Sequence, residues 1–399
     1  MKYKKSVIKL CILLLYVVTA FGNPLIVVSI MIKNEAGKIQ ETLQPFVDGG
    51  ITDFMVFDTG STDGTQNIVR TFFKKNNITN GHIVEEPFIN FATSRNRALE
   101  ITQNIFPEAT FMLMPDAEWY MHNTKDLLRF CANYKDHTDD SYLVRIKNDA
   151  IDFVTARLIR CRRDVRFVGV VHETLNKGSA ITVYNTCYFE WRPSAAGQKK
   201  SALRWQRDRD LLLAEHLKNP TDSRTLFYLA QTYDCLGDHQ KAYEFYKKRT
   251  QAKGWDEENF MAMLRLGSAA THLDTTQKAE VCPLSVQHYL EAFNLRSSRA
   301  EPLIKIAQYY KDKNMMALAF MFAQRAANIQ YPEHDRLFVE KYLYDFVRYD
   351  LLGISAWYIG EYEIGERAVR KALEIKPNAP HLHYNLKLYT DRKTALESK

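Results

Sequence analysis

Two carboxylates separated by a single residue offer the clearest metal-binding pattern in this sequence. Asp116 and Glu118 follow the apolar segment 110–114, which has the composition of a buried strand. Hard divalent cations such as Mg²⁺ and Mn²⁺ prefer oxygen ligands and can bridge to a diphosphate. A lone acidic pair of this kind is common on surface loops, so its meaning depends on what else lies nearby.

Three further polar clusters follow predicted elements in the first half of the chain. Asn34 and Glu35 come after the apolar segment 25–32, and Asp58 opens a loop with two glycines after segment 53–57. An aspartate at the end of a strand can accept hydrogen bonds from a base or a ribose, and the glycines allow close approach of a ligand to the backbone. Asp63 and Gln66 in the same loop fit an ordinary helix capping box.

These clusters require a particular order of strands and helices to meet in space. Strands are predicted at 25–32, 53–57, 82–84 and 110–114, and helices at 39–48, 63–73 and 92–103. This alternation predicts an α/β fold with a mostly parallel sheet, in which ligands bind at the carboxyl ends of the strands. From 141 to 192 the pattern is less regular, with strands expected at 142–146 and 182–190.

Taken together, the clusters resemble the family 2 glycosyltransferases, which have the GT-A fold. The resemblance covers about residues 25–192 and is most specific in the segments 32–35, 57–65, 90–96 and 169–173. It implies a donor substrate of the nucleotide-diphosphate sugar class, a divalent metal (Mn²⁺ or Mg²⁺) and single displacement with inversion at the anomeric carbon.

The resemblance also implies roles for particular residues. The nucleotide-sugar set would be Asn34, Glu35, Asp58, Arg95, Asn96 and Asp116, with Glu35 and Asp58 on the nucleoside and Arg95 and Asn96 near the ribose and diphosphate. Asp116 and Glu118 occupy the place of the family's DxD and would bind the metal together with His172. The family usually has aspartate at the second acidic position, where this chain has glutamate.

Sugar transfer also needs a base for the acceptor hydroxyl. Glu173 is the first candidate, and Asp149 and Asp152 are the alternatives. His172 and Glu173 are adjacent, so in a strand their side chains would point to opposite faces. A packed histidine beside a solvated glutamate is the competing interpretation of this pair.

After residue 200 the pattern becomes helical and repetitive. Small residues recur at 230, 267, 307 and 353, at spacings of 37, 40 and 46 residues, which resembles tetratricopeptide repeats with insertions. We therefore expect segment 23–200 to form a GT-A domain, 201–390 a tetratricopeptide-like helical repeat domain and 391–399 a tail. The repeats would bind a glycan, lipid-linked or protein acceptor, or a protein partner.

Residues 1–22 have a basic start, an apolar run and a small-x-small end, as in a cleaved signal peptide or a membrane anchor. This leader predicts the lumen of a secretory pathway or membrane anchoring, with the cytoplasmic face as an alternative. The chain has 399 residues and a formal net charge of +7, four of whose positive charges lie in the leader. Bulk nucleic-acid binding is therefore not expected.

The function that the sequence favours is that of a glycosyltransferase. A catalytically inactive transferase-like domain that serves as a repeat scaffold is the alternative from another class, and a nucleotidyltransferase is a third possibility.

Overall fold

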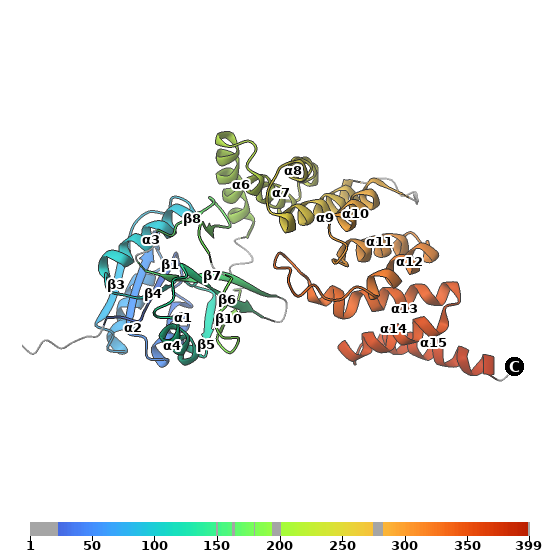
Figure 1. The fold of residues 1–399 in the computed structure, drawn as a ribbon, viewed down its shortest axis with the longest axis horizontal. Coiled ribbons are helices and arrows are strands. Elements are labelled where there is room, and N and C mark those ends of the chain that lie inside the picture. The colour runs from blue at the N-terminus through green and yellow to red at the C-terminus, as the bar shows by residue number, and fades with distance from the viewer. Residues whose placement is uncertain are drawn as a thin grey trace, which may run out of the picture.

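A computed structural model describes residues 23–148, 151–161, 164–178, 180–193, 201–273 and 282–397. The leader, residues 1–22, lies outside these residues, so the structure does not bear on the localisation predicted from it. Within the described ranges, no helix combines the length and the apolar character needed to cross a membrane. Figure 1 shows a sheet with its helices at one end of the molecule and a run of helices extending from it to the C-terminus.

The first part of the chain forms an eight-stranded mixed sheet with the order β3-β2-β1-β4-β7-β6-β10-β5. Its strands are β1 (Ile26–Ile32), β2 (Asp53–Asp58), β3 (Asn80–Glu85), β4 (Phe111–Leu113), β5 (Trp119–His122), β6 (Ser141–Lys147), β7 (Asp152–Arg160) and β10 (Tyr188–Trp191). β1, β2, β3 and β4 pair in parallel, as do β6 and β10. β7 is antiparallel to both of its neighbours, and β5 is antiparallel to β10.

Helices cover both faces of this sheet. α1 (Ile39–Asp48), α2 (Thr65–Lys75) and α4 (Thr124–Asn133) pack on one face, and α3 (Phe91–Ile105) packs on the other. Alternate residues of β1 enter the two cores, with Val28 on one side and Val27 on the other, and both are fully buried. The continuous apolar run of this strand follows from burial on both faces.

The sequence predicted the first four strands, their helices and the strand that forms β6, but not the antiparallel pairing around β7. β5, α4 and β7 were not expected, and strand formation in the predicted segment 182–190 is restricted to β10 and one isolated bridge at Thr182. The sheet is therefore mixed rather than mostly parallel. A small separate pair, β8 (Phe167–Val168) with β9 (Thr174–Leu175), holds the loop between them beside α3.

Every described element after residue 200 is a helix. They are α6 (Ser201–Lys218), α7 (Ser223–Cys235), α8 (His239–Gln251), α9 (Asp256–Leu273), α10 (Leu284–Leu295), α11 (Glu301–Asp312), α12 (Met316–Ala327), the π-helical turn η1 (Leu343–Val347), α13 (Arg348–Ile359), α14 (Tyr362–Ile375) and α15 (Pro380–Glu397). Each helix packs against the next one along the chain. α7 also contacts α9, and α11 contacts α13. This arrangement is a tetratricopeptide-like stack of helix pairs, as the sequence predicted.

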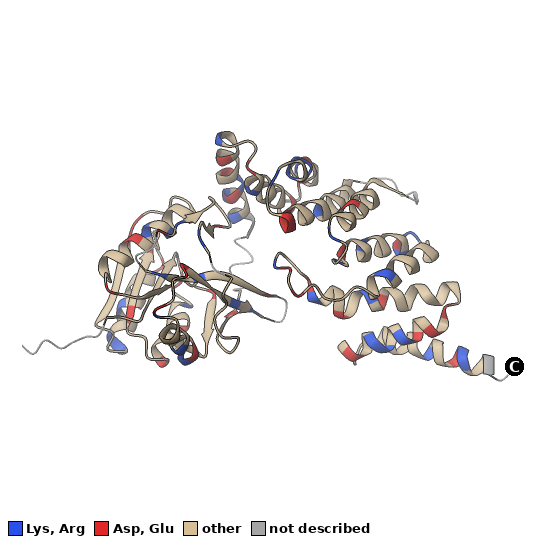
Figure 2. Cartoon of the chain, in the orientation of Figure 1, with Lys and Arg blue, Asp and Glu red and all other residues tan. Residues whose placement is uncertain are grey.

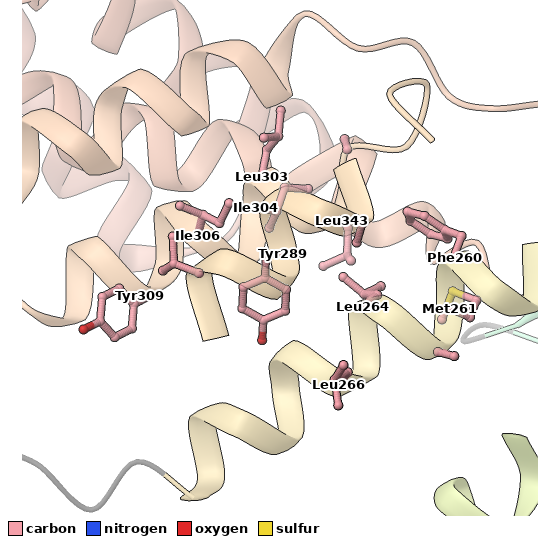
Figure 3. Packing of buried hydrophobic residues seen from close by; sticks show 14 of the residues in the cluster. Phe260, Met261, Leu264, Leu266, Tyr289, Leu303, Ile304, Ile306, Tyr309 and Leu343 are labelled. Atoms are coloured by element: carbon pink, nitrogen blue, oxygen red, sulfur yellow. The ribbon is translucent and has the colours of Figure 1, made fainter. Parts of the chain in front are cut away.

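Small residues allow the paired helices to approach closely. A Cβ atom at Gly267 of α9 would lie 2.6 Å from a ring carbon of Tyr289 on α10. At Gly353 of α13 it would lie 2.6 Å from a methyl group of Val369 on α14. Figure 3 shows Tyr289 surrounded by apolar residues of α9 and α11, within a core that extends from α6 to α14. A second, smaller core joins η1, α14 and α15. Lys and Arg are interspersed with Asp and Glu over both parts of the molecule (Figure 2).

The loop 169–173 joins the sheet to the first helical pair. Val171 is buried in the core of the repeats, and the main-chain N–H of Phe91 donates to the carbonyl of Val170 at 3.3 Å. The ring of His172 stacks on Tyr228 of α7 with 4.2 Å between ring centroids, and Arg224 donates to the carbonyl of His172 at 2.7 Å. This loop thus docks the sheet against α7, in the first helix pair of the stack.

Candidate functional site

The loops that follow β1 and β2 are locked to each other. Asp58 is fully buried, and its Oδ1 accepts hydrogen bonds from the amides of Gly60 and Ser61 at 2.8 and 2.7 Å. Asn34, at φ 57°, accepts from the amide of Thr62 at 2.8 Å. Both side chains therefore organise the backbone, although Asp58 Oδ2 is buried and has no hydrogen-bond partner among the described residues.

Two further contacts complete this pair of loops. The amide of Glu35 donates to Thr65 Oγ1 at 2.9 Å, and the amide of Ala36 donates to Asp63 Oδ2 at 3.1 Å. The predicted capping box is wrong, because the helix starts after Gly64 and Gln66 donates to the carbonyl of Ser61 instead. Asp63 holds the first loop against the second, and the two loops form one rigid edge of the sheet.

A buried ion-pair cluster joins α3, the segment after β4, β7 and the loop between β8 and β9. Arg95 donates through Nε to Glu173 Oε1 at 2.5 Å, and through its second amino group to Asp116. Arg157 of β7 donates to the same Glu173 oxygen at 3.1 Å. The side chains of Arg95, Glu173 and Arg157 are 4%, 6% and 9% exposed, whereas Asp116 is 37% exposed. Two predicted binding residues and the predicted base thus form one cluster.

The cluster fixes the charge of Glu173. Burial alone would raise the pKa of its carboxyl, but Arg95 and Arg157 outweigh burial and lower the pKa to about 2. Burial and the neighbouring Arg95 lower the pKa of Arg157, while Asp116 and Glu173 outweigh burial and raise that of Arg95. A carboxylate with this pKa and these partners accepts a proton poorly, because a general base works best with a pKa near the operating pH.

The three predicted metal ligands do not form a set. Asp116 faces Arg95, whereas Glu118 accepts from Lys38 at 2.7 Å and from the Trp191 indole at 3.3 Å. His172 stacks on α7, where burial lowers the pKa of its ring to about 4. Within the described ranges, no group of three or more His, Cys, Asp or Glu side chains is arranged to hold a metal ion. The structure therefore does not bring these three residues together as the predicted metal-binding set.

The remaining predicted residues also have structural partners or lie elsewhere. The side chain of Asn96 donates to the carbonyl of Phe167 at 2.9 Å and accepts from its amide at 2.7 Å, so it anchors β8. Asp152 starts β7 and pairs with Arg145 of β6 at 2.7 Å. Asp149 lies outside the described residues. Two hollows, one lined by Arg70 and its neighbours and one at 376–379, contain none of the predicted site residues.

A segment that sequence reasoning missed lies on the inner face of the repeats. Residues 331–339, which we call the strap, belong to the long connection between α12 and η1, and Figure 1 shows this connection projecting back toward the sheet. Glu257 of α9 accepts from the main-chain amides of Arg336 and Leu337 at 2.7 and 2.8 Å. Arg299 donates to the carbonyls of Leu337 and Phe338 at 3.4 and 3.3 Å.

Side chains of the strap are also held, among them Asp335 and Phe338. Asp335 accepts two hydrogen bonds from Arg296, both 2.6 Å, and a third from Arg299 at 3.3 Å. Phe338 stacks on Phe227 of α7 with ring centroids 6.5 Å apart. We call the residues that hold the strap the seat; they are Phe227, Glu257, Arg265, Arg296 and Arg299. The only sequence signal for this arrangement was the widest spacing between repeats, 46 residues, which indicates an insertion without showing where it lies.

Comparisons with known proteins return helical repeat proteins. No family model matches the chain, and no curated protein matches its sequence. Among solved structures, MamA is 17% identical over 51% of this chain and 98% of its own, with a TM-score of 0.33. The C-terminal part of a TPR repeat-containing protein from Cytophaga hutchinsonii is 16% identical over 49% and 69%, with a TM-score of 0.37. YrrB, described as a TPR protein with an unusual peptide-binding site, is 14% identical over 48% and 88%, with a TM-score of 0.34.

The resemblance to family 2 glycosyltransferases is therefore corrected. The solved structures compared above are helical repeat proteins rather than glycosyltransferases, and the GT-A assignment receives no support. The structure adds a physical reason, since the carboxylates expected to bind metal are divided between separate ion pairs. The assignment as a transferase enzyme is wrong. A nucleotide sugar and a divalent cation as cofactors stay predictions of the sequence that no finding tests.

Proposed function

We propose that this protein is a binding scaffold whose helical repeats hold an extended segment of a protein partner on their inner face. This is the scaffold alternative that the sequence raised, and it gives the sheet no catalytic role. One observation supports it most: Glu257, only 9% exposed, accepts two main-chain amides of a segment that belongs to no helix. Hydrogen bonds to main-chain groups are how extended peptides gain affinity on a protein surface.

The inner face has the chemistry that such binding needs. Arg299 is fully buried and fixed by Glu301, at 2.9 Å from its Nε, so its remaining donors are pre-oriented toward the strap. Pre-oriented groups lose little entropy when a ligand binds, which increases affinity. Arg265 lies over the rings of both Phe227 and Phe338, at 5.5 and 4.6 Å, and provides an aromatic-binding position.

The proposal is tested by panning a phage-displayed library of random dodecapeptides on the full chain. We expect enriched peptides whose affinity falls at least about tenfold in Arg265→Ala, because the aromatic position is then lost. The matched control is Arg367→Ala on α14, a residue whose side chain is 68% exposed on another helix; its affinity for the peptides should not change.

The proposal fails if neither the wild-type chain nor its Phe338→Ala variant enriches any peptide. It also fails if the enriched peptides bind Arg265→Ala as tightly as wild type.

A further inference from the structure

The strap is bound in the way a separate peptide would be bound. Its main chain is held by the Glu257 carboxylate of α9 and by the Arg299 guanidinium from the connection between α10 and α11, and its side chains Asp335 and Phe338 occupy two distinct positions of the seat. In peptide recognition of this kind, main-chain hydrogen bonds give affinity and side-chain positions give specificity. The contacts of the strap therefore record which features this face selects.

The acidic position is the more selective of the two. Arg296 approaches both oxygens of Asp335 in the planar, two-bond arrangement that guanidinium groups make with carboxylates. Asp335 is 6% exposed and Arg299 is fully buried, so a neutral side chain here would leave buried guanidinium donors without a partner.

The aromatic position lies three residues later. Phe338 remains 40% exposed although it stacks on Phe227 and lies under Arg265. It also has φ 49°, a left-handed conformation that is unfavourable for a bulky side chain. Such a conformation persists only where the surroundings hold it. The strap is thus an imperfect occupant, and a partner that places its aromatic ring without this strain has an advantage.

We propose that the seat is a binding site for extended protein segments with an acidic residue three positions before an aromatic residue, and that the strap occupies this site until such a partner displaces it. The inference rests on the proposed function, since it names the partner class of the same face. Because the strap is tethered at both ends, its effective concentration at the seat is about millimolar. The apparent affinity for a partner equals the intrinsic affinity of the open seat multiplied by the fraction of chains in which the seat is open.

The test uses a fluorescein-labelled synthetic peptide with the sequence of residues 331–342, measured by fluorescence anisotropy. Full-length wild type is compared with the double variant Asp335→Ala/Phe338→Ala, in which the strap is weakened and the seat is intact. We expect the double variant to bind the peptide at least about tenfold more tightly than wild type. A peptide with alanine at the two matching positions should not bind, and adding Arg296→Ala to the double variant should abolish binding.

Folding is controlled in two ways. Circular dichroism shows whether the double variant retains its helices, and the single variant Phe338→Ala, which removes a 40% exposed ring, serves if it does not. The inference is overturned if the strap variants bind the peptide no better than wild type, or if the alanine peptide binds equally well. If library peptides still bind the repeats in that case, the proposed function stands without this inference. If no peptide binds any form of the chain, the proposed function and this inference are both wrong.

Discussion

The charge of Glu173 should be a major contributor to the stability of the sheet. Replacing Glu173 by glutamine keeps the shape of the side chain but removes the negative charge that Arg95 and Arg157 share. Both guanidinium groups are at least nine-tenths buried, and only Asp116 is left to compensate them. Loss of one member of a buried ion pair destabilises proteins by about 3–5 kcal/mol.

The pKa of Glu173 gives a second route to the magnitude. A fall from the ordinary value of 4.5 to about 2 corresponds to about 3 kcal/mol of stabilisation at pH 7. Because the folded-state pKa is depressed, this stabilisation is fully present above pH 4.5 and is lost as the pH falls toward 2. At pH 3 it should be reduced to about 1 kcal/mol.

Urea unfolding of wild type and Glu173→Gln, followed by tryptophan fluorescence at pH 7 and at pH 3, measures both effects. Trp119 is a suitable reporter because its ring lies 5.4 Å from the Arg157 guanidinium. The difference in unfolding free energy should be about 3 kcal/mol at pH 7 and should shrink by about 2 kcal/mol at pH 3.

Glu190→Gln is the matched control. The pKa of Glu190 is also lowered to about 2, by Arg192 first and His122 second, but its side chain is 34% exposed. Solvent screening weakens such pairs, so the variant should differ from wild type by no more than about 0.5 kcal/mol. The reasoning is refuted if Glu173→Gln costs no more than this control at pH 7, or if its effect is the same at both pH values.

Three further substitutions test the packing by urea unfolding. Gly365→Ala should destabilise the last helix pair by at least about 1 kcal/mol, because the new Cβ would overlap the buried ring of Tyr389, and no loss would contradict the close approach of α14 and α15. Tyr344→Phe should cost about 1–3 kcal/mol, since its hydroxyl donates to the buried carboxylate of Glu301 at 2.6 Å, and a neutral result would mean that this contact is dispensable. Asn96→Ala should cost about 1–3 kcal/mol without any ligand present, because its side chain anchors β8, and a stability equal to wild type would restore the view that it serves a ligand.

The sequence predicted elements whose residue pattern within one segment follows directly from how the segment is buried. The apolar run of 25–32 predicted β1, and the small residues Ala230 and Ala307, both fully buried, predicted the helix pairs. In contrast β7 was missed, since the exposed start of this strand at Asp152 breaks the apolar pattern expected of a central strand.

The contacts of the candidate site depend on the directions in which side chains point, which the spacing of residues along the sequence does not specify. Asp116 and Glu118 are two residues apart, yet one faces Arg95 and the other faces Lys38, on opposite sides of their loop. The spacing of the repeats indicated an insertion but not its position, and the return of this segment across α9 depends on Glu257 and Arg299, which are distant in the sequence.

The junction at Val171 has a consequence for biosynthesis. The sheet leaves the ribosome first, and two adjacent valines on its loop stay uncovered until about sixty more residues have emerged and α7 can fold over them. During that interval these apolar side chains of the nascent chain are exposed to solvent. Chains that terminate prematurely near residue 200 are therefore expected to aggregate when they are expressed. A useful truncation would therefore retain α6 and α7 rather than end where the strands do.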